Sequence, residues 1–149
     1  MALIDLVTEN IVKVPLKSRN KPDVLRELVQ VLKDAGQIED FDAVLKALQG
    51  REDKGSTGLG EGIAVPHCKT SAVSTLKLAI GIAPDGVDFD SPDGKPAKLL
   101  FLMVASPNLS GPHVEALAEI AELAQSKTFC SKLICANNAK EIVGLLKDE

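Results

Sequence analysis

The chain has 149 residues, 45% of them hydrophobic and 26% charged, which is enough to bury one ordinary core and too little for two independent ones. Its 17 lysines and arginines against 21 aspartates and glutamates give a formal charge of −4, which argues against an electrostatic grip on nucleic acid or on an anionic membrane. No apolar run approaches the roughly 18 residues of a membrane span, and the N-terminus lacks the pattern of an export signal. We therefore expect a single cytoplasmic domain over residues 1–149 with no direct insertion into a membrane.

Two helices are predicted in the first third of the chain. In residues 20–36, Pro22 suits the first turn, apolar residues recur at helical spacing, and Gly36 suits the end. Residues 39–50 carry a second apolar stripe that ends at a glycine typical of a helix C-terminus, so Arg51 is expected to begin the next loop.

Strands are predicted in the middle of the chain. Residues 75–83 alternate at period two, whereas residues 97–107 are apolar nearly throughout, as expected of a strand covered on both faces. The turn sequence at residues 92–94, Pro-Asp-Gly, favours an antiparallel hairpin with a long loop between them. A further short buried strand is predicted at residues 63–65.

Helical spacing returns in the last third, over residues 111–125, 128–136 and 139–147. The buried side of the first of these helices is predicted to carry Val114, Leu117, Ile120, Ala121 and Leu123. The three cysteines read as free thiols, with Cys130 and Cys135 in the core, because their number is odd and no pair has the spacing of a zinc site. Helices, then strands, then helices indicate an α/β fold around a mixed β-sheet.

A glycine-rich segment, "STGLGEGIAVPHCKT" at residues 56–70, contains one of the two histidines of the chain. Its glycines let the backbone approach a bound group, and Ser56 and Thr57 add hydroxyl donors, so a phosphate-sized group fits. A nucleotide-binding loop is disfavoured, because G-x-x-x-x-G-K-[ST] is absent and no helix pattern with a ribose-binding acid follows the glycines. His67 is expected to emerge from the end of the short strand.

The imidazole of His67 suggests phosphoryl chemistry, since a neutral ring nitrogen is a good nucleophile and a phosphohistidine can pass its group onward. Arg51 could neutralise that group with its planar fork of donors. His113 follows Gly111 and Pro112 in the first turn of a predicted helix, where the helix dipole lowers the pKa of a histidine. A neutral His113 could therefore donate one N–H to phosphate.

Three segments resemble the IIA phosphocarrier domains of the bacterial phosphoenolpyruvate-dependent sugar phosphotransferase system, fructose/mannitol type. In family order they are "REDKGSTGLGEGIAVPH" at residues 51–67, "VDFDSPDGKPAKLLFLMVASP" at residues 87–107, and "HVEALAEIA" at residues 113–121. The resemblance implies a mixed β-sheet flanked by helices on both faces. It also implies that His67 is phosphorylated, that Arg51 supports the active site, and that His113 flanks the phosphohistidine.

In this family the phosphoryl group arrives from the small histidine-containing phosphocarrier protein and leaves for a cysteine on a IIB domain, with no metal, nucleotide or other cofactor. The resemblance thus implies a phosphotransferase component that acts during sugar uptake. A similar branch, the nitrogen-related IIA proteins, acts mainly as a regulator that binds other proteins according to its phosphorylation state. The sequence leaves both functions open.

Cys68 departs from the family pattern, which commonly has glycine or alanine after the active histidine. A thiol there raises the alternatives of a metal site with His67 and His113, of redox sensing, and of a second phosphoryl acceptor. Because adjacent side chains at a strand end point to opposite faces, we expect instead a small residue tolerated at a partly buried position, and no metal. Glu52 is expected to orient Arg51 or to be solvated.

Overall fold

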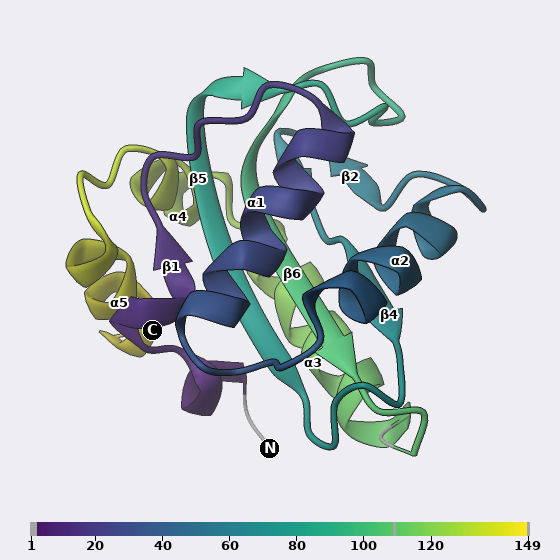
Figure 1. Ribbon diagram of the computed structural model, residues 1–149. Coiled ribbons are helices and arrows are strands. Elements are labelled where there is room, and N and C mark those ends of the chain that lie inside the picture. Colours follow the sequence, from purple (N-terminus) through teal and green to yellow (C-terminus); the bar gives the residue numbers. More distant parts are fainter. Residues whose placement is uncertain (1–2, 109, 149) are drawn as a thin grey trace.

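The computed structural model describes residues 3–108 and 110–148, which form a mixed β-sheet with helices on both of its faces (Figure 1). The first half of the chain contains the elements η1 (Leu3–Leu6), η2 (Glu9–Ile11), β1 (Val12–Lys13), α1 (Lys21–Asp34), α2 (Phe41–Glu52), β2 (Gly58–Gly60), β3 (Ile63–Ala64) and β4 (His67–Lys69), where η marks a 3-10 helix. The second half contains β5 (Lys77–Val87), β6 (Ala97–Ala105), α3 (Ser110–Ala124), α4 (Lys127–Ile134) and α5 (Ala139–Asp148).

The sheet is built around the antiparallel hairpin of β5 and β6, as the sequence predicts. Its strand order is β1-β5-β6-β3-β2, and β4 also pairs with β6. β3 and β4 follow one another along the same edge of β6, both parallel to it, because Ile63 lies opposite Leu99 and His67 lies opposite Met103. β4 therefore holds the glycine-rich segment against the most buried strand of the sheet.

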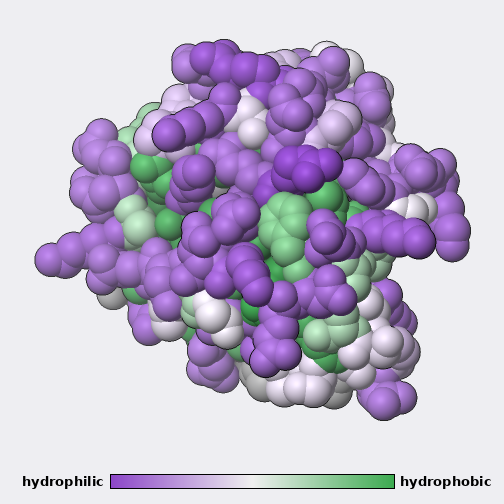
Figure 2. All heavy atoms as spheres, in the orientation of Figure 1, coloured by the Kyte–Doolittle hydropathy of each residue, from purple (hydrophilic) through white to green (hydrophobic). Residues whose placement is uncertain are grey.

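Helices cover the sheet from both sides (Figure 1). α1 packs on β5 and α2 on β4, whereas α3 and α4 pack on β6 from the opposite face. Figure 2 shows hydrophilic side chains over most of the outer surface on the side of α1 and α2, as expected of helices that bury one apolar stripe. The predicted α/β fold, a mixed sheet flanked by helices on both faces, is confirmed. None of the helices in the described ranges is long and apolar enough to cross a membrane.

Local signals explain where α1 begins and ends. The side chain of Asn20 caps the helix by accepting a hydrogen bond from the backbone N–H of Asp23 (2.9 Å), and Pro22 occupies the first turn. Gly36 has a φ of +72°, the left-handed conformation that commonly follows a helix end. The boundaries predicted for this helix are confirmed.

The predicted end of the second helix is wrong. α2 continues through Gly50 to Glu52, so Arg51 lies in its last turn and not in the loop. A glycine inside a helix costs only about 1 kcal/mol relative to alanine, so it need not end one. The glycine with a positive φ that follows this helix is Gly55 (148°), not Gly50.

The buried face of α3 also differs from the prediction. Ile120 is buried as predicted, and Leu117 and Leu123 are partly buried against the core, but Val114 is 63% exposed and Ala121 is exposed. Among the described side chains of the helix, His113 and Ala116 are buried beside Ile120. The prediction considered apolar residues only, so it did not include His113, which lies on the buried face of the helix.

The three cysteines are free. Cys130 is buried as expected, but Cys135 is exposed, so the prediction of a core position for Cys135 is wrong. Cys135 caps the C-terminus of α4, beyond the stripe that faces the core.

Candidate active site

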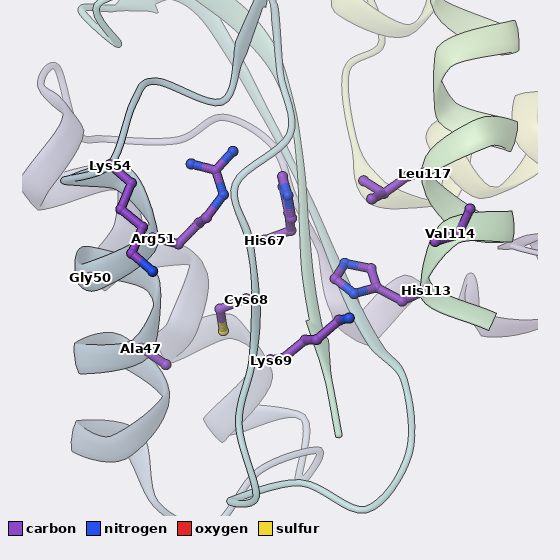
Figure 3. A pocket seen from close by; sticks show the side chains of 10 residues that line it. All are labelled: Ala47, Gly50, Arg51, Lys54, His67, Cys68, Lys69, His113, Val114 and Leu117. Carbon is purple, nitrogen blue, oxygen red and sulfur yellow. The ribbon is translucent and has the colours of Figure 1, made fainter. Parts of the chain in front are cut away.

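A pocket of about 600 Å³ lies between α2, β4 and α3 (Figure 3). It brings together the three residues that the sequence singled out, His67, Arg51 and His113, from three different elements. The lining residues are Ala47, Gly50, Arg51, Lys54, His67, Cys68, Lys69, His113, Val114 and Leu117.

His67 is half-buried and is the first residue of β4, so it does not simply follow the strand at residues 63–65. The strand is anchored directly before it, because the N–H of Met103 on β6 donates to the carbonyl of Pro66 (2.9 Å). Nδ1 of His67 lies 2.7 Å from the carbonyl oxygen of Val65. Since a carbonyl can only accept, Nδ1 carries the proton, and Nε2 of the neutral ring keeps a free lone pair.

His113 stands edge-on to His67, with ring centroids 5.5 Å apart and an interplanar angle of 73°. Its side chain is 4% exposed, and its Nε2 has no hydrogen-bond partner among the described residues. A buried polar atom without a partner costs about 1–3 kcal/mol. An anion entering the pocket would satisfy this atom.

The pKa of His113 lies below the ordinary value for histidine, as the sequence predicts, but the main cause is burial and not the helix dipole. Burial disfavours the charged ring, and electrostatic repulsion from the neighbouring His67 and Lys69 lowers the pKa of His113 further. His113 is therefore poised to remain neutral and to offer a directional N–H.

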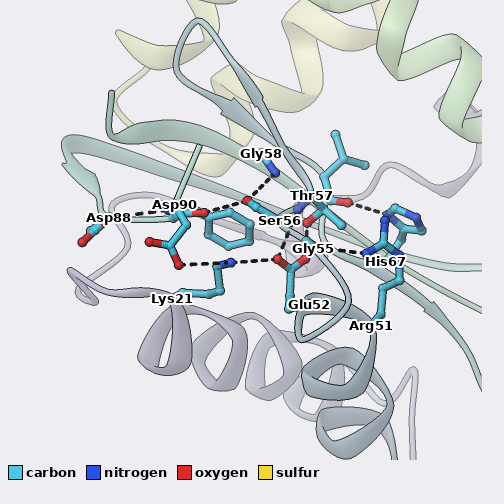
Figure 4. A network of polar contacts seen from close by, with 12 residues as sticks. Lys21, Arg51, Glu52, Gly55, Ser56, Thr57, Gly58, His67, Asp88 and Asp90 are labelled. Atoms are coloured by element: carbon cyan, nitrogen blue, oxygen red, sulfur yellow. Dashed lines mark hydrogen bonds and ion pairs between the residues drawn. The ribbon is translucent and has the colours of Figure 1, made fainter. Parts of the chain in front are cut away.

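Arg51 enters the pocket from the last turn of α2. One of its terminal nitrogens, Nη1, donates to the carbonyl of Gly55 (3.0 Å), which ties the guanidinium to the turn after the helix (Figure 4). The remaining N–H groups of the planar fork stay available to a ligand in the pocket.

A sequence profile described as "Phosphoenolpyruvate-dependent sugar phosphotransferase system, EIIA 2" matches residues 5–149. The chain belongs to this family. It is 36% identical over 146 residues to the fructose-specific EIIABC component of Bacillus subtilis. The match spans 98% of this chain but only 23% of that protein. It is also 33% identical over 147 residues to a nitrogen regulatory protein of Bradyrhizobium diazoefficiens, covering 98% of this chain and 95% of the relative.

Solved structures of similar fold include the nitrogen regulatory protein IIA-Ntr of Neisseria meningitidis, with a TM-score of 0.88, 28% identity, and coverage of 97% of this chain and 98% of that one. A second is the complex of IIA-mannitol with phosphorylated IIB-mannitol of Escherichia coli, with a TM-score of 0.80 and 23% identity. It covers 96% of this chain and 98% of the matched chain. At that identity the second likeness shows the fold alone.

Two lysines of this IIA domain, Lys54 and Lys69, line the pocket although the sequence analysis did not single them out. Lys69 is two residues beyond His67 on the same strand, and alternate residues of a strand point to the same side. That spacing was the signal in the sequence that could have found it. With Arg51, three cationic side chains line the described pocket and no carboxylate does, so the site suits an anion.

Ser56 and Thr57 of this IIA domain do not line the pocket. The hydroxyl of Ser56 donates to the carbonyl of Phe89 (2.8 Å), and that of Thr57 donates to the carboxylate of Glu52 (Figure 4). Both hydroxyl groups therefore hold the loop in place. Glu52 itself is 7% exposed and pairs with Lys21 (3.1 Å), so the alternative that it is solvated is wrong, whereas the alternative that it orients Arg51 stays a prediction.

Cys68 is 4% exposed, and burial raises the pKa of its thiol to about 12. Metal ligation and nucleophilic attack both need the thiolate, which this environment disfavours. Within the described ranges, no three or more histidine, cysteine, aspartate or glutamate side chains are grouped so that they could hold a metal ion. The structure gives no support to the alternatives that use this thiol.

We expect Lys69→Met to raise the pKa of His113, because one of the positive charges that oppose its protonation is removed. His113 then takes up its proton at a higher pH than in the parent. A pH titration of the ring signals by NMR measures this shift. Lys54→Met is the matched control, since Lys54 lines the same pocket but does not contribute to the lowered pKa. An unchanged or lower pKa in Lys69→Met contradicts the expectation.

Proposed function

We propose that this IIA domain carries a phosphoryl group on Nε2 of His67, received from the small histidine-containing phosphocarrier protein of the phosphotransferase system. The observation that carries the proposal is the pocket itself, which His67 lines beside His113 and three cationic side chains, and in which Nε2 of His113 has no partner among the described residues. Membership of the family agrees with this chemistry.

The transfer requires no added cofactor. The lone pair of Nε2 attacks the phosphorus of the donor phosphohistidine, and a new N–P bond forms as the donor's N–P bond breaks and its electron pair returns to the donor ring. Throughout the step Nδ1–H continues to donate to the carbonyl of Val65, which stabilises the positive charge on the phosphorylated ring. The fork of Arg51 and the N–H of His113 neutralise the phosphoryl oxygens.

The rim of the pocket suits a protein partner better than a small substrate. Val114 is 63% exposed, and Leu117 on the same helix lines the pocket with it, opposite Ala47 on α2 (Figure 3). An apolar rim around a charged centre excludes water when a partner docks, and this strengthens the interactions inside. Such a rim supports both a donor carrier protein and an acceptor IIB domain.

We propose onward transfer to a cysteine of a IIB domain during sugar uptake. This draws on the likeness to the fructose-specific EIIABC component and on the IIA–IIB complex of similar fold. The alternative is a regulatory IIA protein whose phosphorylation state controls binding to other proteins. The similarity to a nitrogen regulatory protein over 95% of that relative's length favours this alternative.

The proposal is tested by incubating the chain with phosphoenolpyruvate, the first enzyme of the system and its carrier protein. The expected product is an acid-labile, alkali-stable adduct whose NMR spectrum places phosphorus on Nε2. Adding a purified IIB domain of a fructose or mannitol transporter should then discharge it. The regulatory alternative is supported if no IIB domain discharges the adduct and if the chain binds a regulatory protein according to its phosphorylation state. Absence of any adduct contradicts both functions.

A further inference from the structure

A chain of polar contacts connects the start of α1 to the ring of His67 through residues outside the pocket (Figure 4). Nζ of Lys21 lies 3.1 Å from Oε1 of Glu52. The carboxylate of Glu52 accepts hydrogen bonds from both the backbone N–H (3.2 Å) and the hydroxyl of Thr57. The carbonyl of Thr57 accepts from the N–H of Val65 (3.0 Å), and the carbonyl of Val65 accepts from Nδ1 of His67 (2.7 Å).

The carboxylate of Glu52 is the centre of this chain of contacts, and it is deeply buried. The side chain of Glu52 is 4% exposed and that of Lys21 is 16% exposed, so neither charge is well solvated. A buried charge whose partner is removed must find another partner or move toward water. Loss of Lys21 would therefore displace Glu52 and, with it, the two hydrogen bonds that hold Thr57.

Lys21 also anchors the loop between β5 and β6. Its Nζ lies 3.5 Å from Oδ2 of Asp90 and 4.9 Å from the ring centroid of Phe89. The carbonyl of Phe89 in turn accepts from the hydroxyl of Ser56. One ammonium group thus fixes two neighbouring points, Ser56 and Thr57, of the segment that leads to His67.

The position of the Val65 carbonyl decides which nitrogen of His67 is nucleophilic. With that carbonyl in place, the proton stays on Nδ1 and the lone pair stays on Nε2 of a ring that lines the pocket. If Thr57 shifts, its hydrogen bond to Val65 shifts as well, and the neutral ring can place the proton on either nitrogen. In the tautomer that carries the proton on Nε2, this nitrogen has no free lone pair and cannot attack phosphorus.

We propose that Lys21 and Glu52 are positioning residues of this site: their ion pair holds the Val65 carbonyl so that His67 keeps its reactive nitrogen free. The proposal extends the proposed function, because it assigns the preparation of the acceptor nitrogen to residues that touch neither the phosphoryl group nor the pocket. The same contacts also fix the turn that follows Arg51, since Glu52 is its neighbour in the last turn of α2.

A second ion pair of the chain provides a matched control. Glu27, on α1, accepts from the backbone N–H groups of Lys17 (2.9 Å) and Ser18 (2.9 Å) and pairs with Lys13 (2.8 Å). It combines the same kinds of contact as Glu52, but it lies outside the pocket between α2, β4 and α3. Glu27→Gln should cost stability in the same way without reaching His67.

The experiment compares Lys21→Met, Glu52→Gln, Lys21→Arg and Glu27→Gln in the full chain, labelled with nitrogen-15. The ring spectrum of the unphosphorylated protein reports which nitrogen of His67 carries the proton, and thermal unfolding reports stability. We expect Lys21→Met and Glu52→Gln to lose the Nδ1–H preference and to accept phosphoryl at least about tenfold more slowly. Lys21→Arg should keep the ring spectrum of the parent, because the positive charge is retained. Glu27→Gln should leave both the ring spectrum and the rate of phosphoryl acceptance at parent values.

An unchanged His67 spectrum in folded Lys21→Met and Glu52→Gln overturns the proposal, as does an equal change in Glu27→Gln. If Glu52→Gln fails to fold, the comparison of Lys21→Met with Lys21→Arg decides. The ring spectrum needs no phosphoryl donor. If the parent chain accepts no phosphoryl group, the proposed function fails, while the spectra still decide whether the ion pair positions the ring.

Discussion

His67→Ala is expected to abolish phosphorylation while leaving the fold intact. The side chain is half-buried at the start of β4, and the backbone of that strand keeps its pairing with β6 whatever side chain stands there. The other histidine cannot easily take over, because His113 is 4% exposed and its ring faces the pocket from the opposite side. Mass spectrometry after incubation with phosphoenolpyruvate, the first enzyme and the carrier protein measures the loss.

Cys68→Ala is the control for this variant. Its thiol is the nearest alternative nucleophile in sequence, but burial holds its pKa near 12 and keeps it protonated. Cys68→Ala should therefore be phosphorylated at nearly the parent rate. An adduct that persists in His67→Ala, or a phosphocysteine at Cys68 in the parent chain, means that the acceptor is wrongly assigned.

The second large effect is expected at Arg51 and His113, with a different result for each. Arg51→Lys keeps the charge but loses the planar fork, and Nη1 no longer ties the side chain to Gly55. We expect this variant to be impaired in both receiving and passing on the phosphoryl group. His113→Ala should chiefly impair onward transfer, where the phosphoryl group must be steadied while its bond to His67 breaks.

The size of each loss follows from the loss of one donor aimed at the phosphoryl oxygens. Such a donor is worth about 3 kcal/mol, or roughly a hundredfold in rate. Rapid-mixing measurements of the two half-reactions separate acceptance from delivery. His113→Ala also removes a buried nitrogen that has no partner among the described residues, so the gain from its removal offsets part of the cavity cost. Small and equal losses of rate in both variants would still allow His67 to be the acceptor, but they would contradict the proposed roles of Arg51 and His113.

Much of the fold could be predicted because its signals are local. The two ends of α1 are marked in the sequence by Asn20, Pro22 and Gly36. The Pro-Asp-Gly turn predicts the hairpin of β5 and β6. The strands β1, β2 and β4 could not be found in this way. They have two or three residues each, and their pairing with partners elsewhere in the chain, not their own pattern, makes them strands.

The candidate site divides in the same manner. His67 stands out because glycines and a proline precede it, and Arg51 and His113 were named through chemistry and resemblance; the structure gathers all three around one pocket, and their roles remain predictions. Lys69 was missed because its two-residue spacing from His67 is informative only once residues 67–69 are known to form a strand. The burial of Glu52 could not be predicted because its buried partner, Lys21, lies on another helix.

The hydrogen bond from Met103 to the carbonyl of Pro66 ties the start of β4 to a strand whose residues 99–105 are fully buried. Amide hydrogens in such a strand exchange with solvent only when the centre of the molecule opens, whereas loops open with far less free energy. His67 is thus attached to the most deeply buried strand of the sheet although it borders a surface pocket. We therefore expect the attachment of Pro66 to β6 to persist while surface loops open, so that the start of β4 stays in register with Met103.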